Sequence, residues 1–273
     1  MFFKELYAYR YLLREIVAKN IKIQYRNSFL GMIWTLLDPL LTTLVLVFVF
    51  GFLLGRGGDP DYVVNFPIYL LCGRLLFHFY SQSTKKAMRS VRSSASVIKK
   101  VKVPKHVYPL SCTMSAYVSF LFSMVILVGF VIFFFLLKNP NYPPPKLTLY
   151  ILMAPIPLLI LFILSMGAGL ILSTMSVFFK DVEYIYDVFC MLLFYTTPII
   201  WTPEGRFASR PAMMAILNYN PLYCIIEMFR NSVLRGLPID MYHFWYALGV
   251  SLGLLLIGIL LFRSKQDKFI LHI

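Results

Sequence analysis

The sequence predicts an all-α integral membrane protein with six transmembrane helices, preceded by an amphipathic helix at the membrane interface. Of its 273 residues, 59% are apolar and only 14% are charged, whereas soluble domains carry about 25% charged residues. Mean hydropathy is +0.74. The apolar residues form long continuous runs without the alternation of membrane strands, which favours helices over a barrel.

Six runs approach the length needed to cross a bilayer, which is about 20 residues for roughly 30 Å of hydrocarbon. Arg74 interrupts the second run, and Asp187 lies near the start of the fifth. The fourth is long enough to be tilted or bent, and Pro155 and Pro157 give a local reason. The predicted spans are approximately residues 32–54, 65–80, 111–137, 149–179, 182–200 and 244–262.

The distribution of Lys and Arg predicts the orientation, because these residues favour cytoplasmic loops. With six spans, 18 of the 26 fall on the face that holds both termini and seven fall on the other. Both termini are therefore expected in the cytoplasm. This topology accounts for the net charge of +14 without a nucleic-acid partner. Attraction of membrane lipid headgroups or of a phosphorylated substrate stays open.

Motifs for metal binding, redox chemistry or nucleotide hydrolysis are not found in the sequence. Its four Cys and four His are scattered, without the paired spacing of a zinc or redox site. Asp38, Arg74 and Asp187 read as isolated charges in or beside predicted spans rather than an acid–base pair. There is no Gly-x-x-x-x-Gly-Lys-Ser/Thr motif. The chain is therefore not expected to be an enzyme, and no metal or cofactor is assigned to it.

Residues 1–22 predict the amphipathic helix. Phe2, Leu6, Tyr9, Leu13 and then Ile16 or Val17 recur at the spacing of one helix face, with basic residues on the opposite side. Such a helix is expected along the cytoplasmic interface, its apolar side in lipid. The alternative is an amphipathic helix packed on the rest of the protein.

Several short motifs follow in order. Tyr-Arg-Asn-Ser-Phe-Leu-Gly at residues 25–31 precedes a first span that contains Trp34 and Pro39. Further pieces lie at residues 101–105, 108–110, 179–182, 197–200, 220–222 and 229–230. Together they resemble the permease subunits of type-2 ABC exporters for polysaccharides, which include O-antigen, capsule and wall teichoic acid. The resemblance covers essentially the whole chain.

This resemblance implies one ABC transporter transmembrane domain over residues 1–273, in the bacterial plasma membrane. Residues 32–262 would form its six-helix region and residues 263–273 a cytoplasmic tail. Residues 24–31 would form a first coupling helix and roughly 96–105 a second, both inserted into a cytoplasmic ATPase. A capped turn at Asn27 or Ser28 is compatible with that role. The expected coupling residues are Gln24, Tyr25, Arg26, Asn27, Ser28, Phe29, Leu30, Gly31, Lys100, Val101, Lys102, Val103 and Pro104.

A continuous helix from the first coupling segment is expected to carry force to Trp34 and Asp38 over one to two turns. Residues 202–237 are broken by several Pro and Gly, and the resemblance implies short re-entrant helices there that close an outer gate. The motif at residues 25–31 has no second copy in the C-terminal half. The chain is therefore expected to form a homodimer with two ATPase subunits, which would bind ATP and magnesium.

In the family, a conduit at the dimer interface is lined by aromatic and small polar side chains that can stack on sugar rings. Candidates here are Trp34, Asp38, Arg74, Phe77, Tyr80, Tyr195 and Trp201. Each aromatic residue has lipid-facing or interfacial anchoring as its alternative. Arg74 would contact substrate pyrophosphate, pair with Asp38, or snorkel to the interface.

The function expected from this resemblance is export of lipid-linked polysaccharide from the cytoplasmic to the outer face, with wall teichoic acid slightly favoured over O-antigen. A drug or other small-molecule ABC exporter is the main alternative. A secondary transporter would need ion-coupling acids and often internal repeats, and neither is apparent. A membrane glycosyl or acyl transferase would need clustered acids or histidines, which are also missing from the sequence.

Overall fold

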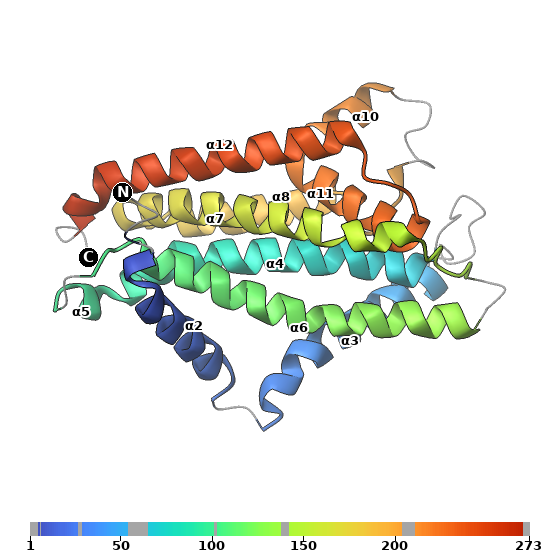
Figure 1. The fold of residues 1–273 in the computed structure, drawn as a ribbon, viewed down its shortest axis with the longest axis horizontal. Coiled ribbons are helices and arrows are strands. Elements are labelled where there is room, and N and C mark those ends of the chain that lie inside the picture. Colours follow the sequence, from blue (N-terminus) through green and yellow to red (C-terminus); the bar gives the residue numbers. More distant parts are fainter. Residues whose placement is uncertain are drawn as a thin grey trace.

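The computed structural model describes residues 5, 7–26, 29–53, 65–100, 103–137, 142–203 and 211–269, and within these ranges every regular element is a helix (Figure 1). The α-helices are α2 (Arg10–Tyr25), α3 (Trp34–Leu46), α4 (Phe66–Ser93), α5 (Ala95–Ile98), α6 (Val107–Leu137), α7 (Pro155–Phe178), α8 (Val182–Thr196), α10 (Pro211–Asn218), α11 (Pro221–Arg230) and α12 (Met241–Lys265). Short 3-10 turns are η1 (Gly31–Ile33), η4 (Leu149–Met153) and η6 (Gln266–Lys268), and π-helical turns are η2 (Val47–Leu53) and η5 (Asn231–Arg235).

Four helical stretches in the described part of the chain are long and apolar enough to cross a bilayer: Gly31–Leu53, Val107–Leu137, Leu149–Phe178 and Met241–Lys268. They confirm a multi-pass membrane protein. The two other predicted runs also form helices, α4 and α8. However, α4 carries several charged residues, and α8 has 15 residues, about 22 Å at 1.5 Å per residue. The six-span arrangement therefore remains a prediction.

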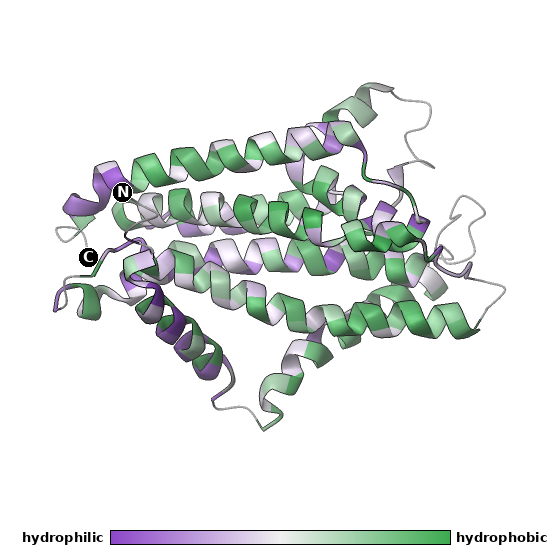
Figure 2. Ribbon diagram, in the orientation of Figure 1, coloured by the Kyte–Doolittle hydropathy of each residue, from purple (hydrophilic) through white to green (hydrophobic). Residues whose placement is uncertain are grey.

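Helix α4 is the centre of the bundle. It packs against both α6 and α7, and α7 packs in turn against α12 (Figure 1). Every residue from Phe66 to Gly73 is buried. Figure 2 shows hydrophobic residues along most of α6 and α12, whereas α4 is mixed. The least apolar long helix is thus surrounded by other helices, as expected when polar side chains are kept from lipid.

Small residues allow the long helices to approach closely. A Cβ atom added at Gly167 of α7 would lie 2.5 Å from the backbone nitrogen of Leu255 in α12. One added at Gly258 would lie 2.8 Å from the carbonyl oxygen of Gly167. The two backbones therefore touch at this crossing, a packing mode typical of membrane helices.

Local sequence explains several helix starts. Asn65 precedes α4, and its side chain accepts a hydrogen bond from the backbone N–H of Ile68 at 3.2 Å. Asp240 caps α12 in the same way through Tyr242 at 3.1 Å. Pro155 occupies the first position of α7, where the missing N–H costs nothing. The long fourth run is consequently divided into η4 and α7 at this proline.

Candidate coupling segments, substrate cavities and α11 clamp

Helix α2 overlaps the predicted amphipathic helix from Arg10 onward, and part of it packs on α6. Phe2 and Leu6 lie outside the described residues. Leu13 is buried, in a cluster that includes Val107 and Tyr108. Tyr7 and Tyr11 are each 69% exposed, so aromatic surface remains available to lipid. Leu13 thus packs on the rest of the protein, as the alternative in the sequence analysis expects. Binding of the other apolar side chains of this helix to the membrane interface remains a prediction.

The first predicted coupling segment is not one helix. Gln24 and Tyr25 end α2, Arg26 lies in a turn, and Phe29 and Leu30 lie in a bend. Gly31 opens η1 with φ +51°, a left-handed conformation that interrupts an α-helix. The expectation of a continuous helix reaching Trp34 and Asp38 is therefore wrong. The side chain of Phe29 is fully exposed; Asn27 and Ser28 lie outside the described residues.

Helix α2 has a direct polar contact with the central helix beside this segment. The Lys86 ammonium of α4 donates a hydrogen bond to Oε1 of Gln24 at 2.9 Å. Because α2 also packs on α6, lateral contacts with α4 and α6 connect the end of α2 to the bundle. Contacts with α4 and α6 replace the expected helical connection to α3.

The second predicted coupling segment contains α5 and a turn at Lys99 and Lys100. Lys100 is exposed, whereas Val103 and Pro104 are half-buried; Val101 and Lys102 fall in a gap between the described ranges. Just beyond, Lys105 donates a hydrogen bond to the carbonyl oxygen of Gln266. Burial lowers the pKa of Lys105, and nearby Asp267 opposes that shift. This contact joins the segment to the C-terminal end of α12.

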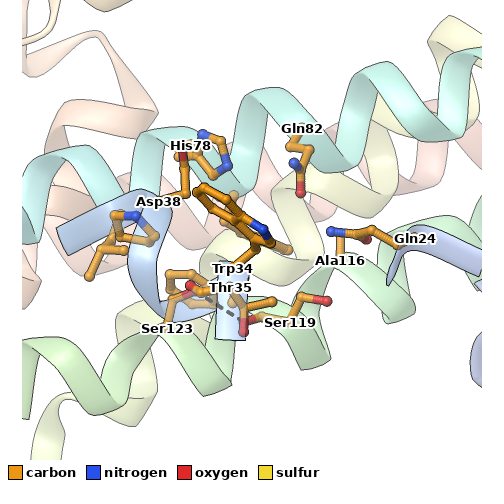
Figure 3. A pocket seen from close by; sticks show the side chains of 13 residues that line it. Gln24, Trp34, Thr35, Asp38, His78, Gln82, Ala116, Ser119 and Ser123 are labelled. Carbon is orange, nitrogen blue, oxygen red and sulfur yellow. Dashed lines mark hydrogen bonds between the residues drawn. The ribbon is translucent and has the colours of Figure 1, made fainter. Parts of the chain in front are cut away.

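A cavity of about 300 Å³, lined by both apolar and polar side chains, lies between α3, α4 and α6, beside the end of α2. Figure 3 shows the indole of Trp34 within it, with Asp38 on the same helix. Ser123 of α6 donates a hydrogen bond to the Thr35 carbonyl at 2.9 Å, which ties α6 to α3 at the cavity wall. The polar lining comprises Gln24, Thr35, Asp38, His78, Gln82, Ser119 and Ser123.

A second cavity, of about 490 Å³, lies between α3, α4 and α8. Arg74, Phe77 and His78 line it together with Ser81, and His78 lines both cavities. The ring of Phe77 packs edge-on against Phe194 of α8 with centroids 5.1 Å apart. Nη1 of Arg74 is buried without a hydrogen-bond partner in the described protein. The second cavity therefore combines an aromatic wall with an available cationic donor.

The structure separates the predicted path residues into two groups. Trp34 and Asp38 line the first cavity, and Arg74 and Phe77 line the second. The proposed pairing of Arg74 with Asp38 is not observed: among the described ion pairs within 4.0 Å, none joins these residues.

The other three candidates line neither cavity. Tyr80 is buried. Tyr195 is 63% exposed near the end of α8, and its carbonyl accepts a hydrogen bond from the Trp201 indole at 3.4 Å. Any contact of these residues with substrate must therefore come from a surface other than the two cavities.

Sequence reasoning missed His78 and Gln82 on α4. They follow Arg74 at successive four-residue steps, a spacing that places side chains on one helix face. Ser119 and Ser123 of α6 show the same spacing. This periodicity of polar residues within apolar helices was the available signal.

Asp187 is not isolated, contrary to the sequence-based expectation. Its carboxylate lies 2.8 Å from the Lys85 ammonium and 3.6 Å from the Arg89 guanidinium. Glu183, one turn earlier on α8, pairs with Arg89 at 2.9 Å and with Arg92 at 2.7 Å. These five side chains, the α4–α8 ion cluster, hold the start of α8 to the second half of α4.

Three of the short sequence motifs, at residues 197–200, 220–222 and 229–230, meet in space. Asn220, before α11, donates a hydrogen bond to Oγ1 of Thr197 at 3.1 Å. Arg230, at the end of α11, donates one to the carbonyl oxygen of Pro198 at 2.7 Å. Contacts at both ends of α11 thus hold the non-helical segment after α8, a junction that we call the α11 clamp. In the sequence, Arg230 counts among the seven Lys and Arg expected on the face opposite the termini and belongs to the motif at residues 229–230, but no partner was predicted for it.

Apolar helices packed around a more polar central helix form an arrangement expected of a membrane permease. The family model for ABC-2 type transporters matches residues 11–234, and the chain belongs to this family. This membership confirms that the chain is a permease rather than the ATPase of such a transporter.

Curated relatives are similar over nearly the whole chain. The O-antigen export system permease protein RfbA of Klebsiella pneumoniae is 27% identical over 94% of this chain and 93% of its own length. The RfbA protein of Myxococcus xanthus is 25% identical over 97% and 96%. The polysialic acid transport protein KpsM of Escherichia coli is 22% identical over 93% of both chains.

Proposed function

We propose that this chain is the permease of an ATP-driven exporter that moves lipid-linked polysaccharide from the cytoplasmic to the outer face of a bacterial plasma membrane. The observation that carries this proposal is full-length similarity to permeases named for O-antigen export and polysialic acid transport. A drug or other small-molecule exporter is less well supported, because the relatives described above are named for polysaccharides. They favour an O-antigen-like or capsule-like glycan over the teichoic acid expected from sequence.

The cavities suggest how such a substrate is handled. Trp34 and Phe77 present aromatic faces on which sugar rings can stack, while Asp38, His78 and Gln82 can exchange hydrogen bonds with hydroxyl groups. The unpaired Nη1 of Arg74 can donate to a phosphate of the lipid carrier. We assign the cavity wall on α4 to the substrate path, which a second copy of the chain would complete.

The energy would come from two ATPase subunits bound to a permease homodimer, with ATP and magnesium held by the ATPases. The end of α2 and the α5 segment are assigned to ATPase contact. Exposed Phe29 offers an apolar anchor there and exposed Arg26 a charged one. Force applied at this segment would reach α4 and α6 through the sides of α2, since η1 interrupts the path to α3.

The test is reconstitution of the permease with its ATPase in proteoliposomes that contain lipid-linked O-antigen or capsule polymer in the outer leaflet of inside-out vesicles. A lectin added outside the vesicles measures the polymer that is still exposed there. A fall in lectin binding when ATP is added would support the proposal. Transport of small apolar drugs without any movement of polymer would overturn it and favour the alternative.

Within that assay, Arg74→Ala is expected to reduce polymer transport strongly while co-purification of the ATPase is unchanged, because the lost group faces the cavity. Arg74→Lys should retain part of the activity through its charge. Arg263→Ala removes an arginine outside both cavities and is the matched control. Normal transport by Arg74→Ala would show that Arg74 only snorkels.

A further inference from the structure

Phe269 is fully buried although it follows a turn with exposed charged residues. Its exposed fraction is 0%, whereas Asp267 and Lys268, in η6 just before it, are exposed. The rings of Phe262 and Phe178 pack edge-on against its ring, with centroids 5.1 and 5.8 Å away. Phe269 therefore packs against both the end of α12 and the end of α7.

The same turn contacts the segment between α5 and α6. Nζ of Lys105 lies 5.9 Å from the centre of the Phe269 ring, within the range of a cation–π contact. The same nitrogen donates a hydrogen bond to the carbonyl oxygen of Gln266. Figure 1 shows α5 at the same end of the bundle as the end of α12. Two contacts thus tie Lys105 to the turn after α12.

Phe269 also belongs to a cluster of buried apolar side chains that includes the packed side of α5. We call it the end cluster, and its members are Leu13, Val91, Ile98, Val107, Tyr108, Leu110, Leu170, Val177, Phe262 and Phe269. Ile98 is the buried residue of α5, while Val97, Lys99 and Lys100 are exposed. The α5 segment therefore turns one side to the end cluster and leaves the other side accessible.

Helix α5 depends on this cluster for its position. It has four residues, Ala95–Ile98, and a helix this short is not stable in water without tertiary packing. Its exposed side is the part of the second coupling segment that a partner can reach. The placement of that side is consequently set by the side chains that pack around Ile98 and hold Lys105.

We propose that Phe269 is a positioning residue for ATPase binding. By filling the end cluster and contacting Lys105, it keeps α5 in the conformation that the ATPase binds. The proposal rests on the proposed function in assuming that the α5 segment contacts the ATPase. It adds the turn after α12 to the parts of the chain on which that contact depends.

Hydrogen exchange of the purified permease, without ATPase, tests whether Phe269 holds α5. The amides of residues 98–100 donate hydrogen bonds to carbonyl oxygens of the same segment, at 3.0 Å, so their protection reports whether α5 is formed. Phe269→Ala should speed their exchange about tenfold or more, because truncation of a buried phenylalanine costs more free energy than a tenfold change in an equilibrium. Exchange in α11, which lies away from α5 (Figure 1), should not change. Unchanged exchange at residues 98–100, or an equal rise in α11, would overturn the proposal.

Binding of the ATPase to the permease in nanodiscs tests the consequence. Phe269→Ala should raise the dissociation constant about tenfold or more, since fewer permease molecules have α5 in place. Phe269→Leu keeps an apolar side chain of similar size and should retain slow exchange and affinity. Phe122→Ala, at a ring that is 51% exposed on α6, is the matched control and should leave both unchanged. A lower melting temperature of Phe269→Ala with an unchanged dissociation constant would show a structural role only and refute the proposal.

A double-mutant cycle tests whether Phe269 acts through Lys105. Lys105→Met removes the donor to Gln266 and the charge beside the ring but keeps an apolar stem. Alone it should speed exchange and weaken ATPase binding less than Phe269→Ala does, and in the Phe269→Ala background it should add little. Additive effects would contradict a shared contact. If Phe269→Ala does not fold, unchanged exchange at residues 98–100 in Lys105→Met would refute the positioning role.

The two measurements separate this proposal from the proposed function. Exchange needs neither ATPase nor polysaccharide, so failure of the unaltered permease to bind an ATPase would count against the proposed function. The role of Phe269 fails instead if the unaltered permease and Phe269→Ala bind the ATPase equally well.

Discussion

Replacement of Gly167 by alanine tests the helix crossing that closes the bundle. The new methyl group would meet three backbone atoms of α12 at 2.5, 2.7 and 2.8 Å, and backbone cannot rotate away as a side chain can. The helices must therefore separate. Overpacking of this kind costs about 1–3 kcal/mol, against a gain of about 0.5–1 kcal/mol for replacing a helical glycine by alanine.

Gly253→Ala on α12 is the control that isolates the packing cost, because its Cβ would meet nothing within 4 Å while the helix-propensity gain is the same. The two variants should differ by about 1–3 kcal/mol. At roughly 2–4 °C per kcal/mol, Gly167→Ala should melt roughly 2–12 °C below Gly253→Ala. Thermal unfolding of the purified protein, followed by tryptophan fluorescence, measures the difference. Equal melting temperatures would refute close backbone contact at this crossing.

Three further changes address other parts of the molecule. Glu183→Gln removes the charge that pairs with Arg89 and Arg92. These pairs are partly exposed, and a pair at the surface contributes about 0–1 kcal/mol, so the melting temperature should fall slightly, and less at high salt. The Tyr25→Ala, Arg26→Ala double variant should insert normally but lose ATPase co-purification and polymer export, and normal binding with normal export would remove the coupling assignment. Burial lowers the pKa of His106, with Glu5 opposing and Arg263 reinforcing the shift. The unfolded state then binds more protons below about pH 6.5, so stability should decline as pH drops below that value. His106→Asn should flatten this decline, and an unchanged pH profile would argue against it.

Local sequence was sufficient for the long apolar helices. The runs at residues 111–137 and 244–262 appear as α6 and α12 because length and apolarity are properties of a single segment. The break before Trp34 was not predictable in the same way, since Gly31 is compatible with both helix and turn until its φ of +51° is observed.

Partnerships between distant segments could not be predicted. Asp187 looked isolated because Lys85 and Arg89 belong to another helix. Arg230 was counted among the Lys and Arg expected on the face opposite the termini, and its acceptor at Tyr69 lies 161 residues away. The four-residue spacing of Arg74, His78 and Gln82 was visible in the sequence. Only the packing of α3 and α6 beside α4 shows that this face lines cavities.

Arg230 of the α11 clamp is fully buried, which constrains the order in which the protein can be assembled during biosynthesis. Inserted alone, a segment containing Glu227, Arg230 and Arg235 would meet a cost of about 2.5–3.5 kcal/mol for Arg or another charged group at mid-membrane. The Tyr69 and Pro198 carbonyls that bind Arg230 are synthesised earlier. Stable burial of α11 must therefore await α4 and residues 197–201, and a nascent chain truncated before Pro221 would leave those carbonyls without their guanidinium. Such a chain should be a preferred substrate for membrane quality-control proteases.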